Sequence, residues 1–205
     1  MSTSFPAGFF DRVDPSPDAH FYAAPRLVTH IDDRAVDGVG ALYEELAVDG
    51  DVLDLMSSWV SHLRAKPRSL TVLGMNTVEL EANPLADARV VHDLNASPVL
   101  PFPDEAFDAV LNCVSVDYLV HPVEVLAEVA RVLRPGGLSV CSFSNRCFPS
   151  KAVQGWLSVP ERDRPRVVAE YHRLAGGFDE TVVEQRLVAT WRHDPLWAVW
   201  ARRQV

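Results

Sequence analysis

Hydrophobic residues recur along this chain in short runs, separated by polar or helix-forming stretches. Runs rich in β-branched residues occupy positions 51–56, 69–75, 88–94, 107–114 and 137–144. Several are apolar at successive positions, which is typical of strands buried on both faces of a parallel sheet. Strands that alternate with helices predict a doubly wound, mostly parallel α/β fold with right-handed crossovers.

The stretches between these runs predict helices. "DDRAVDGVGALYEELAVDG" offers Asp33 as an N-cap and Gly50 as a stop, so it predicts a helix over 34–48. "HPVEVLAEVARVLRPGG" carries a second apolar stripe and ends at Pro135 with two glycines. "VLDLMSSWVSHL" (52–63) predicts a buried strand that leads into a further helix.

The C-terminal part of the chain has a different pattern. Residues 150–177 predict a broken helix, interrupted at Pro160 and Pro165. Two strand-like runs follow at 180–189 and 194–204, joined by a short turn-like connection. They predict an antiparallel hairpin at the edge of the sheet.

Length and composition limit the class of protein. A chain of 205 residues suits a single domain, 1–205, with 1–33 as an N-terminal arm or lid and 51–205 as the α/β core. The net charge of -9 argues against a nucleic-acid surface. No run approaches the ~18 apolar residues of a membrane span, and the start does not resemble a secretion signal, so we expect a cytoplasmic protein with no membrane partner.

Cysteine and histidine spacings add two expectations. Three cysteines without a CxxC pair fit a reducing compartment. The histidines show no ligand spacing, so we expect no metal site.

Polar residues follow each predicted strand, at 54–61, 74–76, 93–95, 112–118 and 144–146. In open parallel sheets, ligands bind beyond the carboxyl ends of the strands. We therefore expect these five segments to converge on one cleft.

The string "LPFPDEAFDAVLNCVSVDYLVHPVEVLAEVARVLRPGGLSVCSFSN" (100–145) resembles the class I S-adenosylmethionine-dependent methyltransferases, in particular their type 11 group. The resemblance extends from residue 52 to the terminal hairpin. It implies a seven-stranded Rossmann-like sheet, S-adenosylmethionine as cofactor and a small-molecule acceptor. It also implies that the helix at 34–48 lines the substrate side.

The resemblance assigns cofactor contacts position by position. The family's first strand ends in a DxGxGxG-like turn, and here Met56, Ser58 and Val60 fill the glycine positions. Asn76 stands where the family has an acid that binds the ribose hydroxyls, whereas Asp93-Leu94 matches the adenine-edge pair intact. The implied cofactor pocket comprises Asp54, Met56, Ser57, Ser58, Trp59, Met75, Asn76, Asp93, Leu94 and Asn112.

Acceptor-side candidates come from the arm and from the far rim. They are Tyr22, His30, Asp117, Tyr118 and Arg146. Three of them also have a structural interpretation: Tyr22 as an anchor of the arm, His30 as a structural histidine, and Arg146 in a surface or capping role. Methyl transfer needs no fixed catalytic dyad, because alignment with a reactive sulfonium supplies much of the acceleration.

Two functions therefore remain open. One is methyl transfer to a small molecule. The other is a non-catalytic binding or scaffold role, suggested by the turn without glycines and by Asn76 in place of an acid. A nicotinamide oxidoreductase ranks below both, because no GxGxxG follows a predicted strand. The sequence specifies neither the acceptor nor the oligomeric state.

Overall fold

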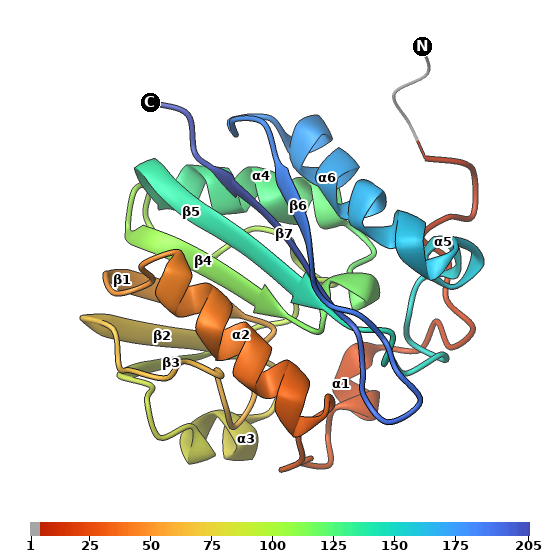
Figure 1. Ribbon diagram of the computed structural model, residues 1–205. Coiled ribbons are helices and arrows are strands. Elements are labelled where there is room, and N and C mark those ends of the chain that lie inside the picture. Colours follow the sequence, from red (N-terminus) through yellow and green to blue (C-terminus); the bar gives the residue numbers. More distant parts are fainter. Residues whose placement is uncertain (1–4) are drawn as a thin grey trace.

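The computed structural model describes residues 5–205, which are organised around a seven-stranded sheet of order β3-β2-β1-β4-β5-β7-β6 (Figure 1). The first five strands are parallel, and β7 pairs antiparallel with both β5 and β6. This confirms the predicted doubly wound sheet with a C-terminal antiparallel hairpin. The strands are β1 (Asp51–Leu55), β2 (Ser69–Gly74), β3 (Ala88–Val91), β4 (Phe107–Cys113), β5 (Leu133–Phe143), β6 (Val182–Leu187) and β7 (Leu196–Arg202).

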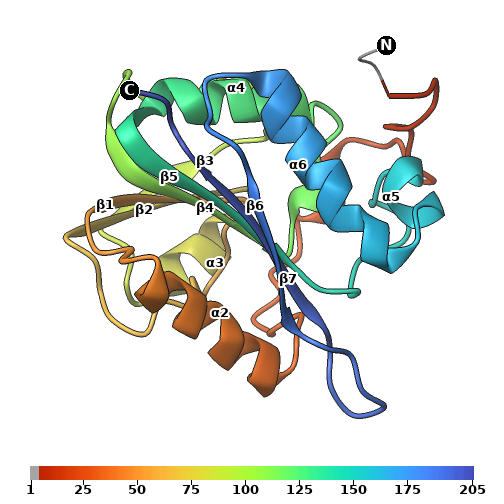
Figure 2. The same ribbon diagram turned by 45° about the horizontal axis from the view of Figure 1, so that its top comes forward.

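Helices cover both faces of the sheet (Figure 2). One face carries α2 (Asp33–Glu45) and α3 (Thr77–Ala82), and the other carries α4 (Pro122–Val132) and α6 (Arg164–Ala175). The shorter elements are α1 (Asp18–Phe21), η1 (Val116–Tyr118), α5 (Gln154–Ser158) and η2 (Glu161–Asp163). No helix within residues 5–205 is both long and apolar enough to cross a membrane.

Two apolar cores form because alternate strand residues point to opposite faces. In β1, Leu53 and Leu55 join the cluster beneath α4 and α6, whereas Val52 joins the cluster beneath α2. All three side chains are buried. The continuous apolar pattern of the central strands therefore reflects burial on both sides.

The predicted helix ends need small corrections. Asp32, not Asp33, caps α2, because its carboxylate accepts a hydrogen bond from the Ala35 N–H at 2.8 Å. The helix stops at Glu45, and Ala47 adopts a left-handed φ of 54°, so the stop precedes Gly50. Pro165 lies in the first turn of α6, where the missing N–H costs nothing, and does not interrupt it.

The helix expected directly after β1 is absent, so that prediction is wrong. Residues 56–68 form an irregular connection to β2. Met56 and His62 both have left-handed backbone angles, with φ of 53° and 54°. A right-handed helix cannot pass through such residues, so these two positions explain its absence.

The N-terminal arm is tied to the rest of the protein by backbone and charged contacts. The Gly155 N–H donates to the Phe9 carbonyl at 2.7 Å. Asp18 is buried and accepts bonds from Arg12 at 2.7 Å and Asn95 at 2.8 Å, while its carboxylate lies 3.2 Å from the wholly buried Lys151 ammonium. These contacts hold the arm across the carboxyl ends of β3 and β5.

Candidate functional site

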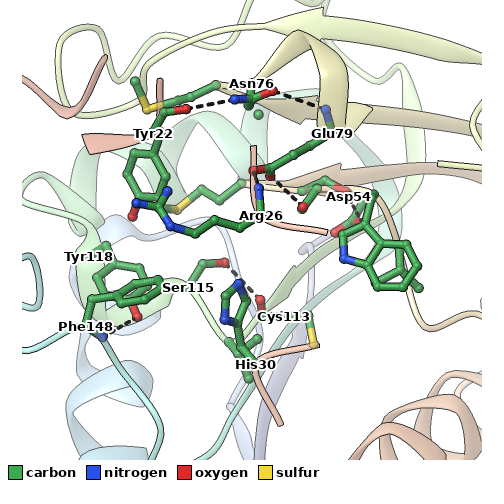
Figure 3. Close-up of a pocket in the computed structure, with 18 of the residues that line it drawn as sticks. Tyr22, Arg26, His30, Asp54, Asn76, Glu79, Cys113, Ser115, Tyr118 and Phe148 are labelled. Atoms are coloured by element: carbon green, nitrogen blue, oxygen red, sulfur yellow. Dashed lines mark hydrogen bonds between the residues drawn. The ribbon is translucent and has the colours of Figure 1, made fainter. Parts of the chain in front are cut away.

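A cavity of about 310 Å³ lies at the carboxyl ends of the parallel strands, between the sheet and the N-terminal arm (Figure 3). It is bordered by the segments that follow β1, β2, β3, β4 and β5, which brings together the five segments expected to converge. Its walls include nine of the ten residues assigned to cofactor binding: Asp54, Met56, Ser57, Ser58, Trp59, Met75, Asn76, Asp93 and Leu94.

The turn after β1 keeps a glycine-like backbone shape although it contains no glycine. Met56 occupies the left-handed region, which costs a non-glycine residue about 1–2 kcal/mol. The Ser57 N–H donates to the Leu73 carbonyl of β2 at 2.8 Å. A Cβ on Gly74 would lie 2.3 Å from the Ser57 carbonyl oxygen, so only glycine at position 74 allows this close approach.

Asp54, near the end of β1, holds the turn after β1 in place. Its side chain is buried and accepts a hydrogen bond from the Ser57 hydroxyl at 2.6 Å. Burial raises the pKa of Asp54 to about 6, an effect that the serine hydrogen bonds only partly offset. The carboxylate therefore serves as a buried acceptor at the floor of the cavity.

Residues 22–30 of the arm pass over the cavity, and we call this segment the strap. The Asn76 amide donates to the carbonyls of Tyr22 at 2.9 Å and Ala23 at 3.2 Å. The Trp59 indole N–H donates to the Val28 carbonyl at 3.1 Å. Two positions that sequence reasoning assigned to the cofactor thus hold the strap in place.

Asn76 has little hydrogen-bonding capacity left for a ligand. Its amide makes both donor contacts with the strap, and its oxygen accepts from the Glu79 N–H at 3.2 Å as the N-cap of α3. In this arrangement Asn76 is a structural residue.

Glu79 is a cavity residue that the sequence analysis missed. Its buried carboxylate accepts from the Arg26 N–H and from the Ser58 hydroxyl, both at 2.6 Å. The available signal was the N-x-x-E spacing from Asn76, which is a capping-box pattern. Here the carboxylate turns toward the strap, so it joins the strap to the turn after β1.

Asp93 lies in the cavity wall as expected. One of its carboxylate oxygens accepts from the N–H groups of Asn95 at 2.9 Å and Ala96 at 3.2 Å. The other oxygen has no protein hydrogen bond within residues 5–205. Asp93 therefore shapes its own loop with one oxygen and keeps an acceptor for a ligand.

Four of the five acceptor-side candidates also line the cavity: Tyr22, His30, Tyr118 and Arg146. The Tyr118 hydroxyl accepts from the Phe148 N–H at 2.9 Å, which fixes Phe148 beside the His30 ring. Arg146 pairs through Nε with Asp194 at 2.8 Å. Burial lowers the pKa of His30, which favours the neutral imidazole.

Three expectations about the cavity do not hold. Asn112 is buried beneath its floor and accepts from the Ser115 hydroxyl at 3.3 Å. Asp117 lies in η1 with its side chain buried away from the cavity, and this burial raises its pKa to about 7. No residue of α2 lines the cavity, because α2 packs on the face of the sheet and the strap occupies the substrate side.

Known proteins share both sequence and fold with this chain. Residues 55–141 match the family model described as a methyltransferase domain. The chain is 32% identical over 152 residues to the ubiquinone/menaquinone biosynthesis C-methyltransferase UbiE of Chromobacterium violaceum, an alignment that covers 67% of this chain and 62% of the relative.

Among solved structures, an S-adenosylmethionine dependent methyltransferase from Mesorhizobium loti superposes with a TM-score of 0.55 at 16% identity, covering 82% of this chain and 100% of that one. A chain of a complex containing the Haloferax volcanii Trm112 methyltransferase activator gives a TM-score of 0.62 at 17% identity, covering 84% and 91%. These likenesses establish the fold.

The chain spans less than two thirds of the curated relatives it matches. Three other curated quinone methyltransferases align over 53 to 80 residues, and the chain covers only 23–29% of their length. The sequence match over 55–141 and the shared sheet topology nevertheless agree with each other and with the motif at 100–145. Residues 55–141 are therefore similar to a methyltransferase domain, and the chain has the fold of S-adenosylmethionine-dependent methyltransferases of known structure.

Proposed function

We propose that this protein transfers a methyl group from S-adenosylmethionine to a small-molecule acceptor. The observation that carries the proposal is the cavity at the carboxyl ends of the strands, whose wall contains Asp93 with one carboxylate oxygen available. Ligand sites of open α/β sheets lie at this edge. The matched domain and the relatives support the same chemistry.

The residues present fit such a cofactor in three respects. The turn after β1 keeps the backbone shape of a glycine-containing turn. Asp93 offers an acceptor beside the buried Leu94. His62 lines the cavity with a buried Nδ1 that has no partner within residues 5–205, so a polar ligand group can satisfy it.

S-adenosylmethionine supplies an electrophilic methyl group on a sulfonium. The protein's part is to orient the acceptor, to exclude water and to take up a proton where the acceptor must lose one. His30 suits the last role because its imidazole is neutral and faces the cavity. The strap supports water exclusion, since it covers the cavity through bonds to Asn76, Trp59 and Glu79.

A small acceptor fits the space. Ligand cavities usually measure ~300–1,000 Å³, so 310 Å³ lies at the lower end. The matched relatives act in ubiquinone and menaquinone biosynthesis according to their names, which supports an organic small molecule over a macromolecule.

Titration calorimetry with S-adenosylhomocysteine tests the cofactor assignment. We expect saturable binding that Asp93→Asn weakens about tenfold or more, because a charge-assisted hydrogen bond is worth about 1.5–3 kcal/mol. The amide oxygen introduced by this substitution can still accept from the Asn95 N–H, so the variant preserves the loop. Glu81→Gln, on the exposed side of α3, is the matched control. Absence of binding up to millimolar concentration contradicts the proposal.

A second function, a non-catalytic binding module, is favoured by one observation. The side chains of Asn76 and Trp59 are engaged by the strap, so they stabilise a closed cavity rather than a ligand. This function predicts that S-adenosylhomocysteine neither binds nor raises the melting temperature. The same titration therefore separates the two candidates.

A further inference from the structure

Arg26 brings an unneutralised positive charge into the cavity of an acidic protein. Its side chain lines the cavity, and within residues 5–205 no carboxylate lies within 4.0 Å of its guanidinium. In that part of the chain, the only protein acceptors of the guanidinium are backbone carbonyls, Phe21 at 2.9 Å and Ala24 at 3.5 Å. A guanidinium has five N–H donors, so several remain for a ligand.

Two other charged groups of the cavity, Arg146 and Glu79, are already engaged. Arg146 pairs with Asp194, and its side chain is 64% exposed. The Glu79 carboxylate accepts from the Arg26 backbone N–H and from Ser58, and it forms no ion pair with the guanidinium. Burial lowers the pKa of His30 and so favours its neutral form. Among the described residues that line the cavity, Arg26 is thus the arginine whose guanidinium has no ion-pair partner.

Aromatic rings surround this cation. The guanidinium carbon lies 4.5 Å from the centroid of Phe21, 5.6 Å from Phe148 and 5.8 Å from Tyr22. Figure 3 shows the Arg26 side chain extending to the side of the cavity where Tyr22, Tyr118 and Phe148 lie. Stacking on aromatic faces fixes the planar guanidinium and leaves its edge free for in-plane hydrogen bonds.

The aromatic wall is itself rigid. The Phe148 backbone N–H donates to the Tyr118 hydroxyl, and the Phe148 ring packs edge-on against Phe21 and His30 with centroid distances of 5.3 Å. A fixed ring beside a fixed guanidinium selects a flat ligand that presents an anionic group at one end.

We propose that the methyl acceptor is an aromatic compound carrying a carboxylate, with the carboxylate held by Arg26 and the ring beside Phe148. The proposal rests on the methyltransferase function above and specifies its acceptor class. A carboxylate matches the planar fork of arginine, which gives two parallel charge-assisted hydrogen bonds.

Three probes separate charge from shape: 4-hydroxybenzoate, its uncharged methyl ester, and 4-hydroxycyclohexanecarboxylate, which keeps the charge without a planar ring. Each is titrated into the protein saturated with S-adenosylhomocysteine at pH 7.5. We expect 4-hydroxybenzoate to bind at least about tenfold more tightly than either analogue. Equal affinity for the acid and its ester overturns the proposal.

Variants at position 26 locate the effect. Arg26→Gln removes the charge and abolishes the preference for the acid over the ester, whereas Arg26→Lys retains part of it because the charge remains without the fork. Arg162→Gln, whose side chain is 85% exposed near α6, is the matched control and keeps the full preference. A preference that survives Arg26→Gln contradicts the assignment to Arg26.

A last comparison distinguishes this inference from failure of the proposed function. If S-adenosylhomocysteine does not bind at all, the methyltransferase proposal fails. If it binds but Arg26→Gln weakens it relative to 5′-methylthioadenosine, which lacks the amino-acid carboxylate, Arg26 serves the cofactor and the acceptor inference is wrong. Unchanged cofactor affinity with lost acid preference supports the inference.

Discussion

Asn76 offers the sharpest test of how the strap is held, because one side chain performs two separable tasks. Its oxygen caps α3, and its amide group donates to the carbonyls of Tyr22 and Ala23. Asn76→Ala removes both tasks. Asn76→Asp keeps an acceptor for the cap but cannot donate to the strap, since an ionised carboxylate is an acceptor only.

The expected magnitudes follow from these contacts. Loss of an N-cap costs about 1 kcal/mol, and each amide hydrogen bond contributes about 1 kcal/mol. Asn76→Ala should therefore lower the free energy of unfolding by about 2–4 kcal/mol, and Asn76→Asp by about 1–3 kcal/mol. For a chain of this length, the larger loss corresponds to a fall in melting temperature of roughly 5–15 °C.

Amide hydrogen exchange identifies which contact is lost. Both variants should exchange faster within residues 22–30, including the Arg26 amide that donates to Glu79. Only Asn76→Ala should exchange faster in the first turn of α3. Asn145→Ala, an exposed asparagine with one 3.4 Å side-chain contact, should change neither region. Unchanged exchange of the strap in Asn76→Asp would refute this account of how the cavity is closed.

Three further predictions concern burial and packing, each measured by urea unfolding. Burial raises the pKa of Asp117 to about 7, so the unfolded chain loses this proton first and the free energy of unfolding falls as pH rises from about 4 to 7. Asp117→Asn should therefore raise the free energy of unfolding by up to about 4 kcal/mol above pH 7 and leave it unchanged below pH 4. Burial lowers the pKa of His172 to about 4, so the free energy of unfolding should fall by up to about 3 kcal/mol as pH falls from 6.5 to 4. His172→Gln should remove this pH dependence. Gly74→Ala should lower the free energy of unfolding by about 1–3 kcal/mol and weaken cofactor binding, because the added Cβ meets the Ser57 carbonyl. Gly38→Ala is the control, because its Cβ meets the flexible ends of leucine side chains at 3.0 Å. Equal losses of stability in both variants would contradict the packing argument.

The sheet and the edge that carries the cavity were predictable from the sequence because they depend on local patterns. Apolar runs such as 107–114 must be buried on two sides, and parallel strands place their carboxyl ends on one edge. The antiparallel hairpin was predictable for a related reason, since a short turn cannot join parallel neighbours. The family resemblance assigned ten cofactor positions at these strand ends, and nine of them line the cavity.

What could not be predicted depends on contacts between distant residues. Apolar positions in 52–63 suggest a helix, yet left-handed angles at Met56 and His62 and the bond from Trp59 to Val28 produce an irregular loop. The direction of a side chain in a short 3-10 turn also has no periodic signal, so the sequence alone does not place the Asp117 side chain away from the cavity. The role of Glu79 depends on Arg26, 53 residues away in sequence.

The attachment of the N-terminal arm has a consequence for how the protein matures during synthesis. The arm leaves the ribosome before the residues that fix it. Lys151 lies 3.2 Å from Asp18, the Gly155 N–H donates to the Phe9 carbonyl, and Asp194 accepts from the Asp32 N–H at 3.1 Å. A nascent chain that ends before residue 151 has all five parallel strands but lacks Lys151, Gly155 and Asp194, three of the residues that fix the arm. Attachment of the arm is therefore completed late in synthesis, so a truncated product retains the parallel strands and lacks part of the anchoring of the arm.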